Sequence, residues 1–263
     1  MSTTTTLTTI HHFINGAETT GEGDRTQPVY NPPATGQVSA ELRLANEADL
    51  NATVAAARKA ADSWGDISLA KRTAVLFKFR ELVAAHVDDL AELITAEHGK
   101  VLSDAKGEIG RGLEVIEFAC GIPQLLKGDY SDQVSTGIDV FSFREPLGVV
   151  AGITPFNFPV MVPLWMAPMA IATGNAFILK PSERDPSASM LLAKLWKQAG
   201  LPDGVFQVLH GGKETVDGLL THPDVDGISF VALPPRSPST STKPPPSTAS
   251  ASRPWAGQRT TPS

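Results

Sequence analysis

The sequence predicts an α/β protein built around a partial, doubly wound parallel sheet. From residue 148 to residue 231, short apolar segments alternate with longer segments of helical periodicity, which is typical of parallel strands joined by helices. The segment Gly148–Ile153 is almost wholly apolar, as expected of a strand buried on both faces. Strand and turn signals followed by several helical segments come first, so we expect the sheet to carry additional N-terminal helices.

We expect residues 1–11 to be disordered and the ordered chain to begin with a hairpin. Asn15-Gly16 lies inside the strand-like segment His12–Glu18, and Asn-Gly is a common two-residue hairpin turn. The sequence Asn31–Gly36 contains two prolines and a glycine, which favours a second turn.

Four helices are expected between this region and residue 120. The first has apolar residues three and four positions apart from Leu50 to Ala61, which places them on one helix face. The second is expected to start after Ser68 as its N-cap, and the third to cover 87–98 and end at Gly99. The fourth, expected over 103–120, places three apolar residues on one side: Ile109, Leu113 and Ile116.

The remaining chain is expected to alternate strands and helices. Ile138–Arg144 alternates apolar and polar residues, which predicts a half-exposed strand. Parallel strands are then expected at 148–153, 175–180, 204–209 and 227–231, joined by helices at 162–173, 186–199 and 214–221. Such sheets bind ligands at the carboxyl ends of their strands, so candidate site residues should directly follow the strands.

Composition restricts the class of protein. The chain has 263 residues, of which 41% are hydrophobic and 19% charged, and a net charge of −6, which argues against a nucleic-acid partner. The sequence has no run of 18 apolar residues and no secretory signal, that is, no basic region followed by an apolar run. We therefore expect a soluble cytoplasmic protein without a membrane partner. The single cysteine, Cys120, excludes a disulfide framework, and the histidine spacing predicts no metal site.

Residues 232–263 differ from the rest of the chain. They contain 8 prolines and 12 serines and threonines, but no aspartate or glutamate. Neither helical nor strand periodicity is present, so this segment is expected to be disordered.

Residues 12–231 resemble the amino-terminal part of an aldehyde dehydrogenase, and the subtype they most resemble is the CoA-acylating methylmalonate-semialdehyde dehydrogenases. The phrases that carry the resemblance are Phe13–Gly16, Gly110–Glu114, Ile153–Pro159, Pro163–Trp165, Lys180–Asp185 and Leu220–Pro223. The resemblance implies a Rossmann-like sheet without the Gly-x-Gly-x-x-Gly fingerprint, which is absent here after residue 153. It also implies N-terminal strands and helices over 12–130 that pack on a cofactor domain, an oligomerisation strand over 131–147 and a partial NAD-binding domain over 148–231.

The resemblance implies one catalytic residue and five cofactor-binding residues. Asn157 would donate its side-chain amide to the substrate oxyanion, a contact worth about 3 kcal/mol. Lys180 and Glu183 would hold the adenosine ribose hydroxyls, and the carboxylate would repel a 2′-phosphate, which favours NAD over NADP. The remaining cofactor residues would be Arg184 along the adenosine, and Thr154 and Phe156 on the nicotinamide side. From the residues alone, a loop-capping asparagine and a solvated charge cluster remain as alternatives.

Arg111 and Cys120 have contrasting expected roles. By resemblance, Arg111 would face the substrate tunnel, where a guanidinium can clamp the carboxylate of a semialdehyde. The alternative is a surface arginine paired with Glu108 or Glu114. The reaction needs a thiolate, but Cys120 lies at an apolar helix end and is expected to be a packing residue. By resemblance, the family's nucleophile is expected after the Leu-Gly-Gly segment, beyond the end of this chain.

A shifted reading frame would explain the tail. Suitable synonymous codons for residues 234–261 encode, in a shifted frame, Thr-Pro-Ile-Ala and Val-Gln-Ala-Leu-Gly-Gly-Ala-Lys-Asn-His, which continue an aldehyde dehydrogenase sequence. The alternative is a natural disordered tail. Hydrolytic members of the family carry a glutamate before Leu-Gly-Gly, where the shifted frame has alanine. Coenzyme A rather than water is therefore expected to accept the acyl group.

The resemblance implies a parent protein that oxidises malonate or methylmalonate semialdehyde to an acyl-CoA with NAD, in valine or inositol breakdown. It would be a homo-oligomer, dimer or tetramer. This chain is expected to be inactive, as an N-terminal fragment without the nucleophilic cysteine region. Two alternatives stay open: a non-catalytic NAD-binding or oligomer-partner fragment, and a fragment of another semialdehyde dehydrogenase.

Overall fold

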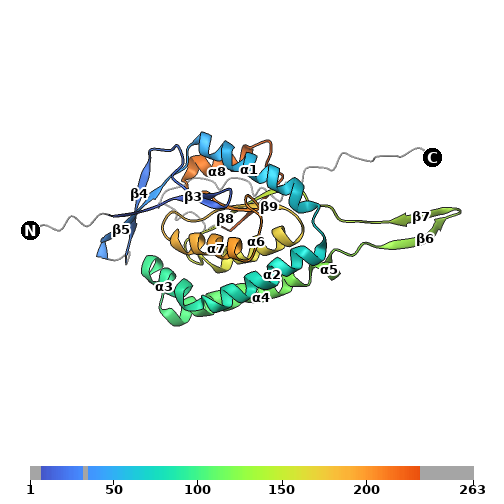
Figure 1. The fold of residues 1–263 in the computed structure, drawn as a ribbon, viewed down its shortest axis with the longest axis horizontal. Coiled ribbons are helices and arrows are strands. Elements are labelled where there is room, and N and C mark those ends of the chain that lie inside the picture. The colour runs from blue at the N-terminus through green and yellow to red at the C-terminus, as the bar shows by residue number, and fades with distance from the viewer. Residues whose placement is uncertain (1–6, 32–34, 232–263) are drawn as a thin grey trace, which may run out of the picture. The chain divides into compact units, whose positions relative to one another are not determined.

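The apolar segments after residue 148 form the centre of a six-stranded sheet. The computed structural model describes residues 7–31 and 35–231, and the sheet has the order β11-β8-β9-β10-β2-β3 (Figure 1). Its parallel strands are β8 (Val149–Ile153), β9 (Ala176–Lys180), β10 (Phe206–Val208) and β11 (Gly227–Phe230). The N-terminal hairpin, β2 (His12–Ile14) and β3 (Ala17–Thr19), continues this sheet antiparallel to β10.

Helices cover both faces of this sheet (Figure 1). The connections α6 (Met161–Ala172) and α7 (Ser187–Gln198) pack on one face, against β8, β9 and β10. The opposite face is covered by α1 (Glu47–Gly65) together with α8 (Lys213–Thr221). The expected α/β alternation is therefore confirmed, with boundaries that agree within one or two residues.

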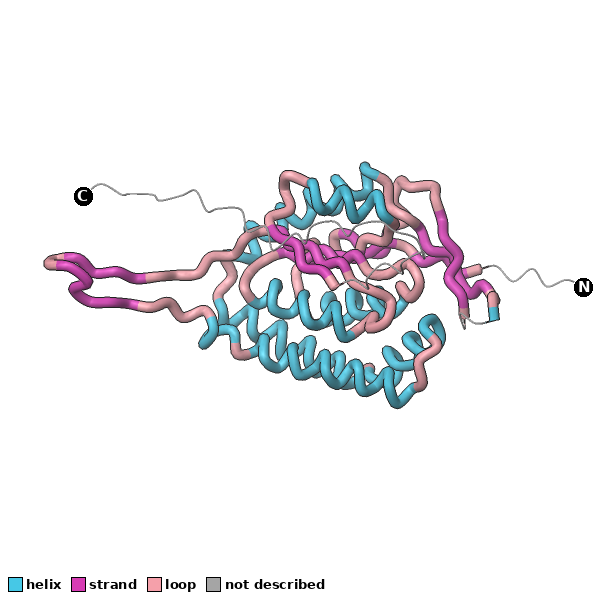
Figure 2. Tube along the Cα trace, turned by 180° about the vertical axis from the view of Figure 1, so that it is seen from behind, coloured by secondary structure: helices cyan, strands magenta, loops and turns pink. Residues whose placement is uncertain are grey.

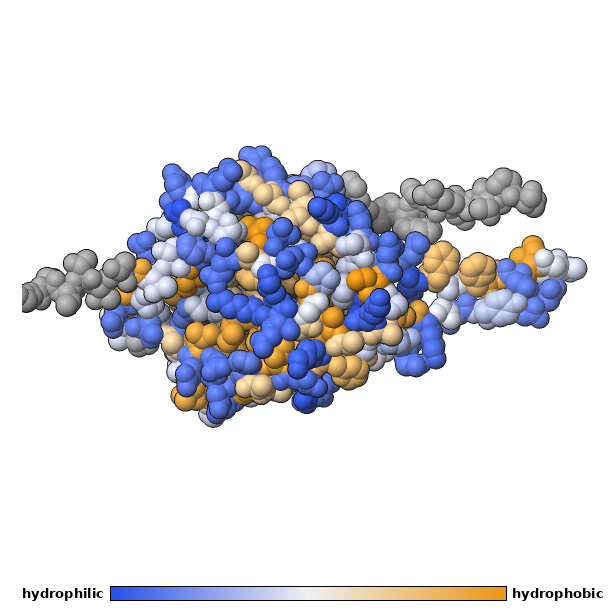
Figure 3. All heavy atoms as spheres, in the orientation of Figure 1, coloured by the Kyte–Doolittle hydropathy of each residue, from blue (hydrophilic) through white to orange (hydrophobic). Residues whose placement is uncertain are grey.

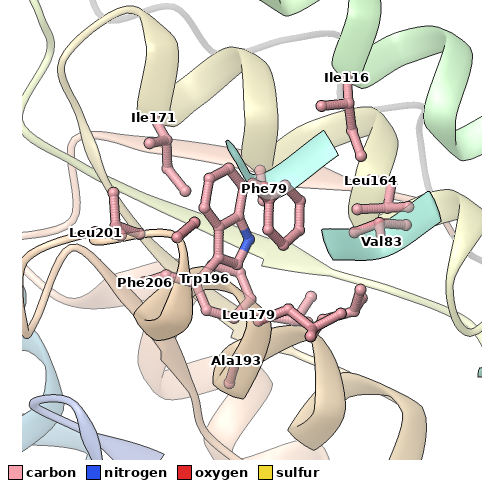
Figure 4. Packing of buried hydrophobic residues seen from close by; sticks show 14 of the residues in the cluster. Phe79, Val83, Ile116, Leu164, Ile171, Leu179, Ala193, Trp196, Leu201 and Phe206 are labelled. Atoms are coloured by element: carbon pink, nitrogen blue, oxygen red, sulfur yellow. The ribbon is translucent and has the colours of Figure 1, made fainter. Parts of the chain in front are cut away.

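A further helical layer lies outside α6 and α7. It consists of α2 (Leu69–Ala85), α3 (Val87–His98), α4 (Leu102–Cys120) and the short α5 (Ile122–Leu125). Trp196 of α7 stacks on Phe79 of α2 with ring centroids 3.5 Å apart (Figure 4). At the crossing of α4 and α6, a Cβ on Gly112 would lie 2.6 Å from Leu164 Cδ1, so the two helices approach closely only because residue 112 is glycine.

A second, three-stranded sheet forms from N-terminal residues, in the order β1-β5-β4. Its strands are β1 (Thr8–Ile10), β4 (Thr26–Tyr30) and β5 (Val38–Arg43). The prediction of disorder over residues 1–11 is therefore wrong for Thr8–Ile10, which pair in parallel with residues 40–42. Residues 1–6, part of the expected 31–36 turn and the unusual segment 232–263 lie outside the described residues.

The segment expected to be a half-exposed strand is one arm of a separate hairpin. β6 (Tyr130–Ser135) pairs with β7 (Ile138–Phe141), and the hairpin stands away from the helices (Figure 2). Every residue of both strands is exposed, so the half-exposed prediction is wrong for this chain. Apolar side chains lie on the hairpin surface (Figure 3), including Val134, Ile138, Val140 and Phe141.

The local turn and cap predictions have mixed outcomes. Asn15 and Gly16 both have positive φ, 49° and 77°, as a type I′ hairpin turn requires. Gly99 ends α3 in the left-handed region with φ 82°, which confirms the expected stop. Ser68 is the N-cap residue of α2, as expected, but its side chain makes no capping hydrogen bond.

Candidate functional site

The order of the parallel strands places a switch point beside β8. In chain order, β8, β9 and β10 follow one another across the sheet, and the next connection returns to place β11 on the other side of β8. Parallel sheets bind ligands outside the carboxyl ends of strands at such a reversal. The ends of β8 and β9 are in register there, with Ile153 opposite Lys180 and Thr154 N–H donating to Lys180 O at 3.1 Å.

Lys180 and Glu183 form an ion pair at the end of β9. Lys180 Nζ lies 2.6 Å from Glu183 Oε1, and the exposed fractions of the two side chains are 6% and 24%. Because the ammonium is almost completely buried, the alternative of a solvated surface cluster does not describe this pair. A buried ammonium requires a partner, and here the partner carboxylate remains open enough to meet a ligand.

Phe156 connects the loop after β8 to the loop after β9. The Arg184 guanidinium lies over the Phe156 ring, with Cζ 4.5 Å from the ring centroid. On α3, the His98 ring stacks on Phe156 at a centroid distance of 6.0 Å. Thr154, in the same loop as Phe156, is buried, and its hydroxyl has no hydrogen-bond partner among the described residues. The loops that contain the expected cofactor residues are therefore adjacent, and Thr154 leaves one buried hydroxyl unsatisfied.

Asn157 is held by its main chain, while its side chain makes no hydrogen bond within the described structure. Its carbonyl accepts a hydrogen bond of 2.9 Å from Lys100 Nζ. The side-chain oxygen is buried without a donor, and no described atom accepts a hydrogen bond from the side-chain nitrogen. The alternative of a loop-capping asparagine is therefore not observed.

A buried ion pair supports the Asn157 loop. Glu108 is fully buried, and its Oε2 lies 2.6 Å from Lys100 Nζ. Its Oε1 accepts hydrogen bonds from Val160 N–H at 2.9 Å and Met161 N–H at 3.1 Å. Lys100 Nζ also lies 4.3 Å from the Phe158 ring centroid. The loop between β8 and α6 is thus fixed on both sides of Asn157.

Arg111 lies near the same loop and forms no ion pair with Glu108 or Glu114 in the described structure. Its Nε lies 3.1 Å from Met161 Sδ, and its Cζ lies 5.9 Å from the Phe158 ring centroid. Glu108 is instead bonded to Lys100 and to the start of α6. The alternative of a surface arginine paired with these glutamates is therefore not observed, and the guanidinium remains available to an anion.

Cys120 is remote from these loops. It is buried at the end of α4, about 18 Å further along the helix than Glu108 at about 1.5 Å per residue. Burial, and then the charge of Glu117, raise the pKa of its thiol, which disfavours the reactive thiolate. These observations agree with the expected packing role.

Two further buried carboxyls, one within the loop after β9 and one packed against its end, were not identified from the sequence. Glu97 of α3 accepts hydrogen bonds from the Ser187 N–H, at 3.0 Å, and from the Ser187 hydroxyl. Burial raises the pKa of Glu97. Asp185 is 2% exposed, and burial, followed by the charge of Glu97, raises the pKa of Asp185 to about 8.

Glu108 and Lys100 were also missed, although the sequence contains a signal for Glu108. It lies three residues after Ala105 and four before Gly112, on the buried stripe of α4, where a charged residue needs a partner. The described residues contain no cluster of three or more histidine, cysteine, aspartate or glutamate side chains that could hold a metal ion. Among them, no helix is long and apolar enough to cross a membrane.

Residues 19–235 match the family model described as the aldehyde dehydrogenase family. Malonate-semialdehyde dehydrogenase of Pseudomonas aeruginosa is 52% identical over 227 residues, which are 86% of this chain and 45% of that protein. Malonate-semialdehyde dehydrogenase 1 of Geobacillus thermodenitrificans is 47% identical over 232 residues, which are 88% of this chain and 48% of that protein. The chain thus spans about half the length of the curated relatives it matches.

Solved structures show the same similarity. The crystal structure of methylmalonate-semialdehyde dehydrogenase from Oceanimonas doudoroffii superposes with a TM-score of 0.83 at 51% identity, covering 85% of this chain and 46% of that one. A Sinorhizobium meliloti protein described as a methylmalonate-semialdehyde dehydrogenase, solved in complex with NAD, gives a TM-score of 0.84 at 48% identity, with coverages of 86% and 46%.

Proposed function

This chain belongs to the aldehyde dehydrogenase family, and we propose that it provides the dinucleotide-binding and oxyanion-stabilising part of a malonate- or methylmalonate-semialdehyde dehydrogenase site. One observation carries the proposal. The Lys180–Glu183 pair and the Asn157 loop lie at the ends of adjacent parallel strands, beside the switch point of the sheet. Sheets of this type bind nucleotides at that position.

NAD is the proposed cofactor, and the residues present fit it. The buried Lys180 and the partly exposed Glu183 offer a donor and an acceptor for the two ribose hydroxyls. The negative charge of Glu183 disfavours a 2′-phosphate at the same place. Thr154 contributes a buried, unsatisfied hydroxyl, and Arg184 on Phe156 forms a planar surface beside the ribose position. NAD, when bound, supplies the hydride acceptor.

Asn157 and Arg111 are proposed to act on the substrate. The Asn157 side chain makes no hydrogen bond within the described residues, while its main chain is fixed. A preorganised donor of this kind stabilises a developing oxyanion by about 3 kcal/mol. The Arg111 guanidinium is free of carboxylate partners in the described structure and can form two parallel hydrogen bonds with a substrate carboxylate. A semialdehyde carrying a carboxylate suits both residues.

The reaction in the parent enzyme also requires a thiolate and an acyl acceptor. We include coenzyme A as the acceptor because the sequence resembles the CoA-acylating subtype; such a reaction belongs to valine or inositol breakdown. In this chain the only cysteine, Cys120, is buried, and its pKa is raised by burial. We therefore propose that the chain alone binds the dinucleotide without oxidising aldehydes.

Calorimetric titration of the chain with NAD and with NADP tests the cofactor proposal. We expect saturable NAD binding that Lys180→Ala weakens, whereas Glu183→Gln weakens NAD binding and narrows the preference over NADP. Lys194→Ala is the matched control, since Lys194 forms an exposed ion pair with Glu18 at 2.7 Å. Absence of NAD binding, or equal affinities for the wild type and Lys180→Ala, would contradict the proposal.

A second candidate function rests on the β6–β7 hairpin. All its strand residues are exposed, and four of them are large apolar residues in β7 and the adjoining end of β6, a pattern that favours pairing with another chain. We propose that the hairpin joins this chain to a second copy or a longer relative. Sedimentation velocity should show self-association that Ile138→Asp abolishes, and a monomeric wild type would reject pairing between copies.

A further inference from the structure

The two helices that follow the site loops begin without caps of their own. The residues before α6 and α7 are Val160 and Pro186, and neither makes a side-chain capping hydrogen bond. Each helix start instead receives a buried glutamate from the outer helical layer. Glu108 of α4 accepts from Val160 N–H and Met161 N–H, and Glu97 of α3 accepts from the Ser187 N–H and hydroxyl.

These helix starts are also the ends of the two site loops. Residues 154–160 run from β8 to α6 and contain Asn157, whereas residues 181–186 run from β9 to α7 and contain Glu183 and Arg184. Both loops are short, so fixing the first turn of the helix restricts the whole connection. We propose that Glu108 and Glu97 are positioning residues, Glu108 for the loop that carries Asn157 and Glu97 for the loop that carries Glu183; this rests on the proposed function.

The Glu108 side of this arrangement is the more extensive. Glu108 is fully buried, so its charge must be compensated inside the protein. Lys100 compensates it at 2.6 Å and also donates to the Asn157 carbonyl at 2.9 Å. One carboxylate thus fixes residues 160 and 161 directly and residue 157 through Lys100.

Helix stability alone does not explain these glutamates. A serine or aspartate at the N-cap position would satisfy the same N–H groups from within the loop. A buried ion pair is often no more stabilising than apolar residues of the same volume, but it restricts geometry when its hydrogen bonds are satisfied. Caps supplied by α3 and α4 tie each loop to a separate helix, which fixes its place relative to the sheet.

Glu97 differs from Glu108 in its surroundings. No ion pair to Glu97 forms among the described residues, and its hydrogen bonds come from Ser187. Glu97 also lies close enough to Asp185, in the loop between β9 and α7, for its charge to raise the pKa of Asp185. Its acceptor oxygens therefore orient Ser187 from below the loop that carries Glu183 and Arg184.

Two matched substitutions, Glu97→Gln and Glu108→Gln, test the assignment in the full chain. Both retain one side-chain oxygen as a hydrogen-bond acceptor, replace the other oxygen by an amide nitrogen and remove the charge. Calorimetry should show that Glu97→Gln weakens NAD binding about three- to tenfold, as expected for partial loss of a charged hydrogen bond. Glu108→Gln should weaken it by a smaller factor, because the loop that Glu108 fixes carries Thr154 and Phe156 but not the ribose-binding Glu183. Hydrogen–deuterium exchange without cofactor should show faster exchange over 154–161 in Glu108→Gln and over 181–187 in Glu97→Gln.

A general structural role would give a different result. Equal effects of both variants on NAD affinity and on exchange in both loops would overturn the proposal, and so would the absence of any local effect. If Glu97→Gln does not fold, Ser187→Ala removes only the hydroxyl contact and should give the same loop-specific exchange. A wild-type chain that binds no NAD rejects the proposed function, whereas a wild type that binds NAD and a Glu97→Gln variant of equal affinity reject only this inference.

Discussion

Replacing Asp185 by asparagine tests whether this buried carboxyl in the 181–186 loop is uncharged in the folded chain. Asp185 is 2% exposed. Burial raises its pKa from 3.8 to about 8, and the charges of Glu97 and Glu108 act in the same direction. The Ser182 hydroxyl lowers the pKa of Asp185 but offsets burial only in part. The folded chain should therefore hold this proton near neutral pH and release it on unfolding.

The magnitude follows from the two proton affinities. Between about pH 4 and pH 8, the unfolded chain binds one proton fewer at residue 185 than the folded chain. The free energy of unfolding therefore falls with rising pH by about 1.36 kcal/mol per unit. Asparagine has no proton to release. The unfolding free energy of the variant, relative to that of the wild type, should therefore rise by about 2.7 kcal/mol between pH 5 and pH 7. The gain should level off above about pH 8, and water entering the ionised loop would reduce it.

Urea denaturation at pH 5, 6, 7 and 8, followed by tryptophan fluorescence, measures this difference. Other groups that titrate in this range, including the buried histidines, are common to both proteins, so they cancel in the comparison. Asp62→Asn on the exposed side of α1 is the control for loss of a surface carboxylate. A difference between Asp185→Asn and wild type that stays constant from pH 5 to pH 8, or that shrinks, would refute a protonated Asp185.

Three further substitutions test the packing and the buried charges. Gly112→Ala brings a Cβ 2.6 Å from Leu164 Cδ1 and should lower the free energy of unfolding by about 1–3 kcal/mol. Gly110→Ala, with open space at its Cβ, should instead raise the free energy of unfolding by up to about 1 kcal/mol. Equal effects of the two variants in thermal melts would contradict the close helix crossing. Lys100→Ala leaves Glu108 buried and unpaired and should cost about 3–5 kcal/mol in urea titrations, against at most about 1 kcal/mol for Lys106→Ala in its exposed pair with Asp88. Burial lowers the pKa of His12 to about 4, so its neutral ring takes up a proton when the chain unfolds below pH 6.5. His12→Asn should therefore lose less stability than the wild type between about pH 6.5 and pH 4. Plots of unfolding free energy against pH that run parallel for the two proteins would contradict this, and a shallower slope for the variant would support it.

The sequence predicted the strands and helices around the site because their signals are local. Val149–Ile153 and Ala176–Lys180 are apolar runs, and both are strands at the centre of the sheet. Gly99 ends a helix because it adopts φ 82°, a conformation that glycine reaches without strain. Local patterns of this kind also placed Lys180 at the end of a parallel strand and Glu183 directly after it.

The missed features depend on residues far apart in the chain. Glu97 and Ser187 are 90 positions apart, and Glu108 and Val160 are 52 positions apart, so no periodicity connects them. Alternation in Ile138–Arg144 indicated two unlike faces, but it could not show that the only described strand partner would be Tyr130–Ser135, which leaves both faces exposed. The main-chain position of Asn157 likewise depends on its contact with Lys100, 57 positions away, and not on the Pro-Phe-Asn-Phe-Pro motif alone.

The outer helices and the parallel sheet share one hydrophobic core, which contains residues from both 12–130 and 148–231. Phe79 stacks on Trp196, and the Trp64 indole donates to the Ile171 carbonyl at 2.8 Å. Without α2, α3 and α4, the segment 148–231 would expose the outer surfaces of α6 and α7 and leave the starts of both helices uncapped. Truncation should therefore remove stability and NAD affinity together, whereas Glu97→Gln should lower affinity in a chain that still folds. A loss of NAD affinity without a loss of folding would show that the outer helices position the 181–186 loop and do not only stabilise it.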